Sequence, residues 1–252
     1  MRSIDLNCDL GESFGAFKIG QDEFVLEYIT SANIACGYHA GDHNTMAKTV
    51  KMAAEKGIKV GAHPGYPDLI GFGRRFIETD PIDIYHLMVY QISALKGFCD
   101  INQVSLEHVK PHGALYNRAA VDPYTAEAIA KAVYDVDRNL VLYGLAGSEL
   151  VKAGTSIGLK VANEVFADRT YQAGGTLTPR NEDLALIHNS NEACKQVIQM
   201  VQSGTVKAVD GSTIPIKADS VCIHGDGPEA LKFAKDLREQ LEQNGIKIAP
   251  FQ

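Results

Sequence analysis

Seven short apolar runs with strand character alternate with longer segments of helical period, and this alternation limits the fold more than any other feature of the chain. The strand-like runs are SIDLNC (3–8), ANIAC (32–36), IKVGAH (58–63), EHVKPH (107–112), LVLYGL (140–145), LKVANEVF (159–166) and SVCIHG (220–225). Between two of them, Met46, Val50 and Ala53 recur at helical spacing. The pattern predicts a parallel sheet with helical crossovers. No Gly/Ser-rich linker divides the chain, so we expect one domain over residues 1–252.

A parallel sheet can be open or closed into a barrel, and the positions of polar side chains separate the two. Such residues follow six of the seven runs: Asp9 and Glu12, His39 and Asp42, His63 and Asp68, Lys110 and His112, Glu164 with Asp168 and Arg169, and His224 with Asp226. An open sheet binds its ligand mainly beside one switch point, whereas in a barrel the carboxyl ends of all strands face one mouth. The distribution favours a (β/α) barrel.

The segment VKAVDGSTIPIKAD (206–219) interrupts the alternation. Two β-rich runs flank Asp210 and Gly211, and Asp-Gly between such runs is a strong hairpin signal. We therefore expect a hairpin insertion near residues 205–218, before the last strand.

The composition excludes several classes of partner. Apolar residues make up 45% and charged residues 22%, as in ordinary globular proteins, and the formal net charge of −7 is spread along the chain without a basic run. We expect neither nucleic acid nor a membrane as partner, which leaves small molecules and proteins, further copies of the chain among them. No segment resembles a signal core or approaches about 20 consecutive apolar residues, so we expect a cytoplasmic protein.

The five cysteines are odd in number, and most of them lie in or beside apolar stretches: Cys8, Cys36, Cys99, Cys194 and Cys222. This usage predicts buried free thiols in a reducing compartment and no disulfide framework.

The first strand carries Asp5, Asn7 and Asp9 on one face, because side chains alternate along a strand. Polar groups that face a barrel interior are costly to bury unless they are paired or used. We interpret Asp9 as a catalytic or binding residue at the mouth, while Asp5 and Asn7 can instead tie the bottom of the barrel together. Glu12 follows the same strand and is a further candidate for the mouth.

The segment NIACGYHAGDH (33–43) places His39 and His43 four positions apart and has two interpretations. Histidine is a good ligand of borderline metals, and this spacing on a helix puts both rings on one side, as in a catalytic metal site. Alternatively, Asp42 caps the following helix and His43 fills its first turn, since a short Asp side chain accepts hydrogen bonds from unpaired N–H groups there. The residues alone leave both interpretations open.

Two further loops carry candidates. GAHPGYPDLIGFGRR (61–75) contributes His63, Tyr66 and one of two adjacent arginines, because a guanidinium can bind a carboxylate or phosphate with two hydrogen bonds. HVKPHGALYN (108–117) places Lys110 and His112 where a strand ends, a position that reads as catalytic in a barrel. The other histidines outside this pattern are interpreted as structural or surface residues: His86, His108 and His188. No Walker phosphate loop occurs. No Gly-x-Ser-x-Gly elbow occurs either, which argues against a serine hydrolase.

Seven ordered segments carry a resemblance to a known family: DLNCDLGESFG, NIACGYHAGD, GAHPGYPD, GFGRR, HVKPHGALYN, EVFADRTY and HGDGP. They span nearly the whole chain, which resembles the LamB/YcsF family. The resemblance implies a distorted, seven-stranded (β/α) barrel of the glycoside hydrolase/deacetylase type. It also implies a reaction, the ATP-dependent opening of 5-oxoproline to L-glutamate with release of ADP and phosphate, in which subunits B and C are the partners.

The resemblance also implies roles for individual residues. Catalytic roles would fall to Asp9, His39, Lys110 and His112. Substrate-binding roles would fall to Asn7, Glu12, His63, Tyr66, Arg74, Asn117, Glu164, Asp168, Arg169, His224 and Asp226. ATP would be a co-substrate used by subunits B and C, because this chain has no nucleotide loop. The resemblance leaves open whether the chain binds a divalent metal. It also leaves open the alternative of a metal-dependent deacetylase or amidohydrolase acting on a carbohydrate or a small cyclic amide.

Two positions depart from the family pattern. The family usually has proline where this chain has His43, and proline is favoured at the first position of a helix. We therefore expect position 43 to be a helix start, and His39 and His43 only to look like a metal pair. The loop TPRNEDLALI (178–187) lacks a Pro-Gly expected after its Pro-Arg, so we expect the loop around Arg180 to be shaped differently.

Overall fold

The computed structural model describes residues 2–223 and 230–251 of the chain. Its main sheet is formed by parallel strands in the seven predicted runs: β1 (Ser3–Leu10), β2 (Ser31–Ala35), β3 (Lys59–His63), β4 (Leu106–Val109), β5 (Val141–Leu145), β6 (Lys160–Phe166) and β9 (Ser220–Ile223). Each strand pairs with the next, and β9 pairs with both β6 and β1, which closes the sheet into a barrel. The predicted seven-stranded (β/α) barrel is confirmed.

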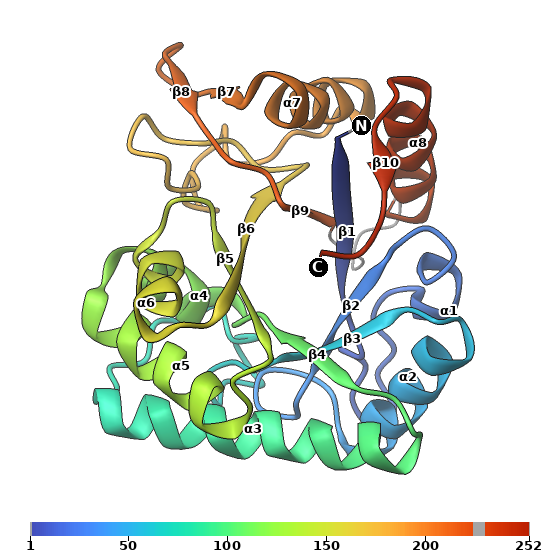
Figure 1. Cartoon of the computed structure of the whole chain (residues 1–252), viewed down its shortest axis with the longest axis vertical. Coiled ribbons are helices and arrows are strands. Elements are labelled where there is room, and N and C mark those ends of the chain that lie inside the picture. Colours follow the sequence, from blue (N-terminus) through green and yellow to red (C-terminus); the bar gives the residue numbers. More distant parts are fainter. Residues whose placement is uncertain (1, 224–229, 252) are drawn as a thin grey trace.

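Helices cover the outside of the barrel (Figure 1). They are α1 (Asp22–Val25), α2 (His43–Glu55), α3 (Pro81–Ile101), α4 (Gly113–Val121), α5 (Pro123–Val136), α6 (Glu149–Ile157), α7 (Ser190–Ser203) and α8 (Ala230–Gln243). Helix α5 lies between α3 and α6 and packs against both. No helix in the described part of the chain is long and apolar enough to cross a membrane.

Alternate faces of β1 show how the barrel divides polar from apolar side chains. Leu6 and Cys8 point outward and are fully buried in the apolar layers between the strands and the helices. Asp5, Asn7 and Asp9 point inward, where their partners come from other strands. The interior of this barrel is therefore filled largely by hydrogen-bonded polar groups, and most of the hydrophobic core lies outside the strands.

One glycine makes room for a large side chain inside the barrel. A Cβ atom at Gly61 on β3 would lie 2.1 Å from the ring of His108 on β4. His108 is buried, stacks on Tyr143 at 4.5 Å between ring centroids, and places Nε2 2.7 Å from Oδ1 of Asn33. The interpretation of His108 as structural agrees with this position in the interior network.

The segment in which we expect a hairpin contains β7 (Thr205–Lys207) and β8 (Thr213–Pro215), which pair antiparallel. Asp210 accepts a hydrogen bond from the backbone of Ser212, and Gly211 has a positive φ of 88°, a conformation suited to glycine in a tight turn. A last strand, β10 (Lys247–Ile248), pairs in parallel with the beginning of β1. It lies at the amino end of the barrel, away from the mouth.

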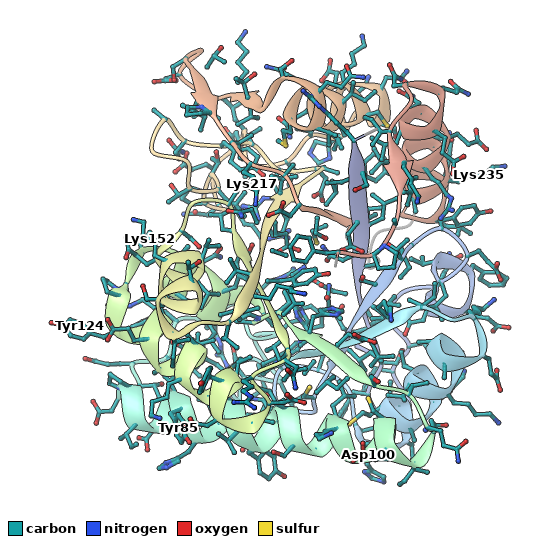
Figure 2. All side chains as sticks on the ribbon, in the orientation of Figure 1. Tyr85, Asp100, Tyr124, Lys152, Lys217 and Lys235 are labelled. Atoms are coloured by element: carbon teal, nitrogen blue, oxygen red, sulfur yellow. The ribbon has the colours of Figure 1, made fainter. Side chains whose placement is uncertain are left out.

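All five cysteines are buried free thiols, as the sequence predicts. Charged side chains lie on the outer faces of the helices, where Asp100 of α3, Lys152 of α6 and Lys235 of α8 are exposed (Figure 2). His86 on α3 and His188 before α7 are exposed as well, in agreement with their interpretation as surface residues.

Candidate functional site

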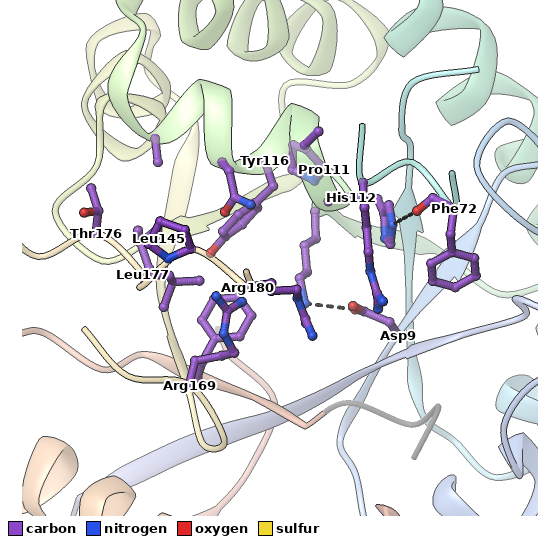
Figure 3. Close-up of a pocket in the computed structure, with 18 of the residues that line it drawn as sticks. Asp9, Phe72, Pro111, His112, Tyr116, Leu145, Arg169, Thr176, Leu177 and Arg180 are labelled. Atoms are coloured by element: carbon purple, nitrogen blue, oxygen red, sulfur yellow. Dashed lines mark hydrogen bonds and ion pairs between the residues drawn. The ribbon is translucent and has the colours of Figure 1, made fainter. Parts of the chain in front are cut away.

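A cavity of about 610 Å³ lies at the carboxyl ends of the barrel strands (Figure 3). Its wall includes eight of the predicted site residues: Asp9, Glu12, His63, Arg74, Lys110, His112, Asn117 and Arg169. They come from β1, β3, the loop after β3, the end of β4, α4 and the loop after β6. The convergence of strand ends on one mouth thus brings together residues far apart in the sequence.

A buried ion-pair group forms the floor of the cavity. Nζ of Lys110 donates to Asp9 at 2.8 Å and lies 2.9 Å from Oε1 of Glu164. The side chain of Asp9 is 12% exposed, against 3% for Lys110 and 0% for Glu164. Asp9 is therefore the carboxylate of this group that reaches the cavity, and Glu164 supports Lys110 from behind.

The charge on Lys110 is held by its carboxylate neighbours. Burial acts to lower the pKa of Lys110, but Asp9 first, then Cys222 and Glu164, outweigh it and leave the pKa well above its ordinary value. Cys222 lies 3.1 Å from Nζ, and burial raises the pKa of this thiol well above its ordinary value. Because Cys222 stays neutral, the two carboxylates supply the negative charge that keeps Lys110 protonated.

Asn7 connects this group to the rest of the interior network. Its amide nitrogen donates to Glu164 at 3.0 Å and to Ser220 at 2.7 Å, while its oxygen accepts from Lys110 at 3.2 Å and from Asn33 at 2.7 Å. Asn7 is fully buried and does not line the cavity. The structure thus places it behind the site, where it orients Lys110 and Glu164.

Three histidines from different strand ends meet beside Asp9. The ring of His39 is stacked on that of His112, with centroids 3.7 Å apart, and both stand edge-on to His63. His39 is fully buried, and neither of its ring nitrogens has a hydrogen-bond partner among the described residues. Burial lowers the pKa of His39 and of His112 well below the ordinary value, so both rings are neutral near pH 7.

The hydrogen bonds of two histidines fix where their protons lie. Nδ1 of His63 is 2.7 Å from the carbonyl oxygen of Lys110, and Nε2 of His112 is 2.8 Å from that of Phe72. Because a carbonyl oxygen only accepts, each of these nitrogens carries a hydrogen. The remaining nitrogens, Nε2 of His63 and Nδ1 of His112, lie 2.9 Å apart. Where both rings are neutral, these nitrogens face each other with lone pairs.

Two facing lone pairs repel unless a cation lies at them. Oδ2 of Asp9 is 3.3 Å from Nε2 of His63, and Oε1 of Glu12 is 3.9 Å from Nδ1 of His112 and 3.6 Å from Nε2 of His39. Potential ligand atoms of Glu12, His39, His63 and His112 all lie within 4.8 Å of one another. Imidazoles oriented by backbone carbonyls together with a carboxylate suit a divalent ion such as Zn²⁺. This group fits a metal ion.

His43 does not belong to this group, in agreement with its interpretation as a helix start. Helix α2 begins at His43, and Asp42 caps it by accepting the N–H of Thr45 at 2.8 Å. His43 itself is exposed. The partners of His39 are instead His63 and His112, which come from β3 and from the residue before α4.

The adjacent arginines after β3 have different surroundings, as expected. Nε of Arg75 donates to buried Asp68 at 3.0 Å, and this carboxylate also accepts the N–H of Gly71. The pKa of Asp68 is lowered to about 2, first by its hydrogen bond from Arg75. Arg74 lies in the cavity wall, 5.0 Å from the ring of Phe72. Arg75 thus holds the loop, and Arg74 faces the cavity.

The loop after β6 is anchored by a residue that we expect to bind substrate. Arg169 is buried, and its guanidinium donates to the carbonyl oxygens of Ala185 and Thr178. It nevertheless forms part of the cavity wall together with Arg180. Asp168 is partly buried, and its backbone carbonyl accepts the N–H of Ile187.

The other predicted residues lie in different places. Tyr66 is 1% exposed, packs in the hydrophobic core and is not part of the cavity wall, so the structure gives it no access to a ligand there. Its burial follows from the tight loop that also holds Gly65 and Asp68. Asn117 on α4 is exposed at the cavity. His224 and Asp226 lie outside the described residues.

Sequence reasoning missed several residues that shape the site. Phe72 has an unusual positive φ of 54°, and its carbonyl oxygen fixes His112. A Cβ at neighbouring Gly73 would lie 2.6 Å from Cβ of His39 and 2.7 Å from the ring of His112. The Gly-Phe-Gly sequence was the available signal, because glycines allow such close approach. No local signal marked Asn33, which donates to Asp9 at 2.9 Å.

Comparison with known proteins agrees with the geometry. The model of the LamB/YcsF family matches residues 4–252. The chain is 64% identical to the 5-oxoprolinase A subunit of Halalkalibacterium halodurans and 62% identical to that of Bacillus subtilis, in both cases over 98% of this chain and 96% of the relative. The crystal structure of a lactam utilization protein from Thermus thermophilus superposes with a TM-score of 0.93 at 42% identity, over 99% of this chain and 100% of that one. This chain therefore belongs to the LamB/YcsF family.

Proposed function

We propose that the chain, as one barrel domain in the cytoplasm, is the ring-opening component of an ATP-dependent 5-oxoprolinase and works with subunits B and C. The observation that carries the proposal is the Asp9–Lys110–Glu164 group at the floor of a cavity, in a chain 64% identical to a relative named as the A subunit of 5-oxoprolinase. A five-membered lactam is a poor electrophile. Subunits B and C would therefore use ATP to phosphorylate the amide oxygen before water attacks.

Asp9 is the general base in this proposal. It is the carboxylate of the buried group that reaches the cavity, and Lys110 and Asn33 hold its Oδ1 at 2.8 and 2.9 Å. Its Oδ2 lies beside His63, on the side of the histidine cluster. A base needs to lie within hydrogen-bond reach of the water that it deprotonates, and this fixed orientation directs one oxygen to that task.

Cationic groups would stabilise the negative charge that develops on the substrate. Lys110 is charged at the floor, and Arg74 lies in the wall. Fixed charges in a site shielded from water act more strongly than the same charges in bulk solvent. The proton that Asp9 takes from water would pass to the leaving nitrogen of the ring through Nε2 of His63, which lies 3.3 Å from Oδ2 of Asp9.

The proposal is tested by measuring glutamate released from 5-oxoproline and ATP by purified subunits B and C, with and without this chain. We expect release only when the chain is present. Equal release in its absence would refute the proposal. If subunits B and C consume ATP without releasing glutamate when the chain is absent, the chain acts after phosphorylation.

A second candidate function is a metal-dependent deacetylase or amidohydrolase, favoured by the Glu12, His39, His63 and His112 group. A divalent ion held there would act as a Lewis acid on an amide or ester carbonyl. This candidate requires stoichiometric Zn²⁺ or another divalent ion and chelator-sensitive hydrolysis without ATP. His63→Ala should abolish metal binding, while His43→Ala, which alters an exposed histidine outside the group, should not. A metal-free chain with full activity would exclude it.

A further inference from the structure

The charges on the cavity wall differ from those of the chain as a whole. The formal net charge of the chain is −7. Among the described residues of the wall, four are cationic, Arg74, Lys110, Arg169 and Arg180, and two are carboxylates, Asp9 and Glu12. A cavity with excess positive charge in an acidic protein concentrates anions by its local field. The ligand of this cavity is therefore expected to be an anion.

The cationic residues are not gathered at one place. Lys110 is engaged with Asp9 and Glu164 at the floor. In Figure 3, Arg169 and Arg180 lie between Leu177 and Asp9, His112 lies above Asp9, and Phe72 lies on the far side of Asp9. The two arginines are close enough that, after burial, the charge of Arg180 is the next cause lowering the pKa of Arg169, to about 10. We refer to Arg169 and Arg180 as the arginine wall.

The part of the cavity at the arginine wall suits an oxyanion attached to a small apolar body. Leu145 and Leu177 supply apolar surface there (Figure 3). The guanidinium of Arg169 is fixed by two carbonyl oxygens and keeps further N–H groups beyond those two bonds. Arg180 is exposed and lies on the same loop as Thr178, whose carbonyl Arg169 binds. A fixed guanidinium beside an exposed one can bind a carboxylate or phosphoryl group through several charge-assisted hydrogen bonds.

We infer that Arg180, positioned beside Arg169, forms an oxyanion subsite on the Leu177 side of Asp9, away from the histidine cluster. A ligand bound in this way would place its carboxylate or phosphoryl group at the arginine wall and its reacting ring over Asp9 and Lys110. The identity of that ring rests on the proposed function. The subsite itself can be tested by binding, without turnover. The subsite and the proposed function can therefore be refuted independently.

The test is calorimetric titration of the full chain with 5-oxoproline, with 2-pyrrolidinone, which has the same lactam ring without the carboxylate, and with inorganic phosphate. Arg180→Gln should weaken binding of 5-oxoproline, phosphate or both by about tenfold or more, the loss typical of a charge-assisted bond. Binding of 2-pyrrolidinone should not change. Arg138→Gln is the matched control, because Arg138 is exposed between α5 and β5, at the amino end of the barrel.

The outcomes distinguish the sources of the oxyanion. Loss of affinity for 5-oxoproline alone assigns the subsite to the carboxylate, and loss for phosphate alone assigns it to a phosphoryl group. The inference is overturned if Arg180→Gln changes neither affinity, if Arg138→Gln has the same effect, or if the wild-type chain binds neither anion. A chain that binds anions through Arg180 but releases no glutamate with its partners keeps the subsite and refutes the proposed function.

Discussion

Asp5 and Asp9 lie on the same face of the same strand, four residues apart, but different groups surround their carboxylates. Asp5 is 1% exposed and accepts hydrogen bonds from the hydroxyls of Thr30, Ser31, Tyr143 and Ser220. Asp9 faces a cavity, a lysine and a histidine cluster that contains buried atoms without partners. In the lower interior, around Asp5, the polar groups bond to one another. In the upper interior, around Asp9, polar groups face the cavity and can bind a ligand. Strand β1 thus carries one carboxylate that stabilises the fold, Asp5, and one that is available for chemistry, Asp9.

The largest effect that this comparison predicts is on turnover. Asp9→Asn keeps an oxygen that can accept from Lys110 but removes the base, so activity should fall by about 10²- to 10⁴-fold, the usual contribution of general base catalysis. The measurement is glutamate release with subunits B and C, alongside thermal unfolding of the isolated variant. A folded Asp9→Asn chain with unchanged turnover would remove Asp9 from the mechanism.

The same substitution four residues earlier should lower stability and leave turnover unchanged. Asp5→Asn replaces an acceptor of four hydroxyl donors by an amide that donates, and it leaves buried hydroxyls unpaired. The free energy of unfolding should fall by about 3 kcal/mol. Urea denaturation measures this loss, and turnover of the folded variant at low temperature should match that of the wild-type chain. If Asp5→Asn instead lost activity without losing stability, the division between lower and upper interior would be wrong.

The interior network should also make the fold sensitive to acid. The pKa of His108 is lowered to about 3, first by burial and then by the charge of Lys110. The unfolded chain takes up a proton on this histidine near its ordinary pKa of about 6.5, whereas the folded chain does not. Stability is therefore fully present above about pH 6.5 and decreases as the pH falls towards the folded pKa, by about 2 kcal/mol at pH 5.

Urea denaturation as a function of pH tests this linkage. His108→Gln keeps a donor for Asn33 but does not titrate, so it should reduce the slope of the profile between about pH 7 and 5 by about one proton. The lowered pKa values of His39 and His112 account for a remaining slope. His86→Gln is the control, because His86 is exposed on α3. An unchanged profile in the His108 variant would show that other groups cause the acid sensitivity.

The fold was predictable from the sequence because its signals are local. Each strand is a short apolar run, and many of the polar residues at the mouth, such as Asp9, Lys110 and His112, follow such a run within a few positions. The partners within the site were harder to predict, since they depend on loop paths. His39 meets His63 and His112, Tyr66 turns into the core, and Asp68 is engaged by Arg75. None of these contacts has a fixed sequence spacing, and hydrogen bonds to carbonyls such as that of Phe72 leave no trace in residue type.

The smallest predicted effect concerns His43, which resembles a site residue but lies outside the histidine cluster. Asp42 has φ −147° and ψ 176°, an extended conformation that a following proline accepts, and His43 is the first residue of α2. His43→Pro should therefore stabilise the chain by about 0.4–1 kcal/mol, because proline restricts the unfolded chain without disturbing the helix. Asn44→Pro is the contrasting variant: it forces the preceding helical residue away from its conformation and should destabilise. Urea denaturation measures the free energy of unfolding of both variants, which should change in opposite directions. A loss of stability or of Zn²⁺ binding in His43→Pro would show that His43 contributes to the site.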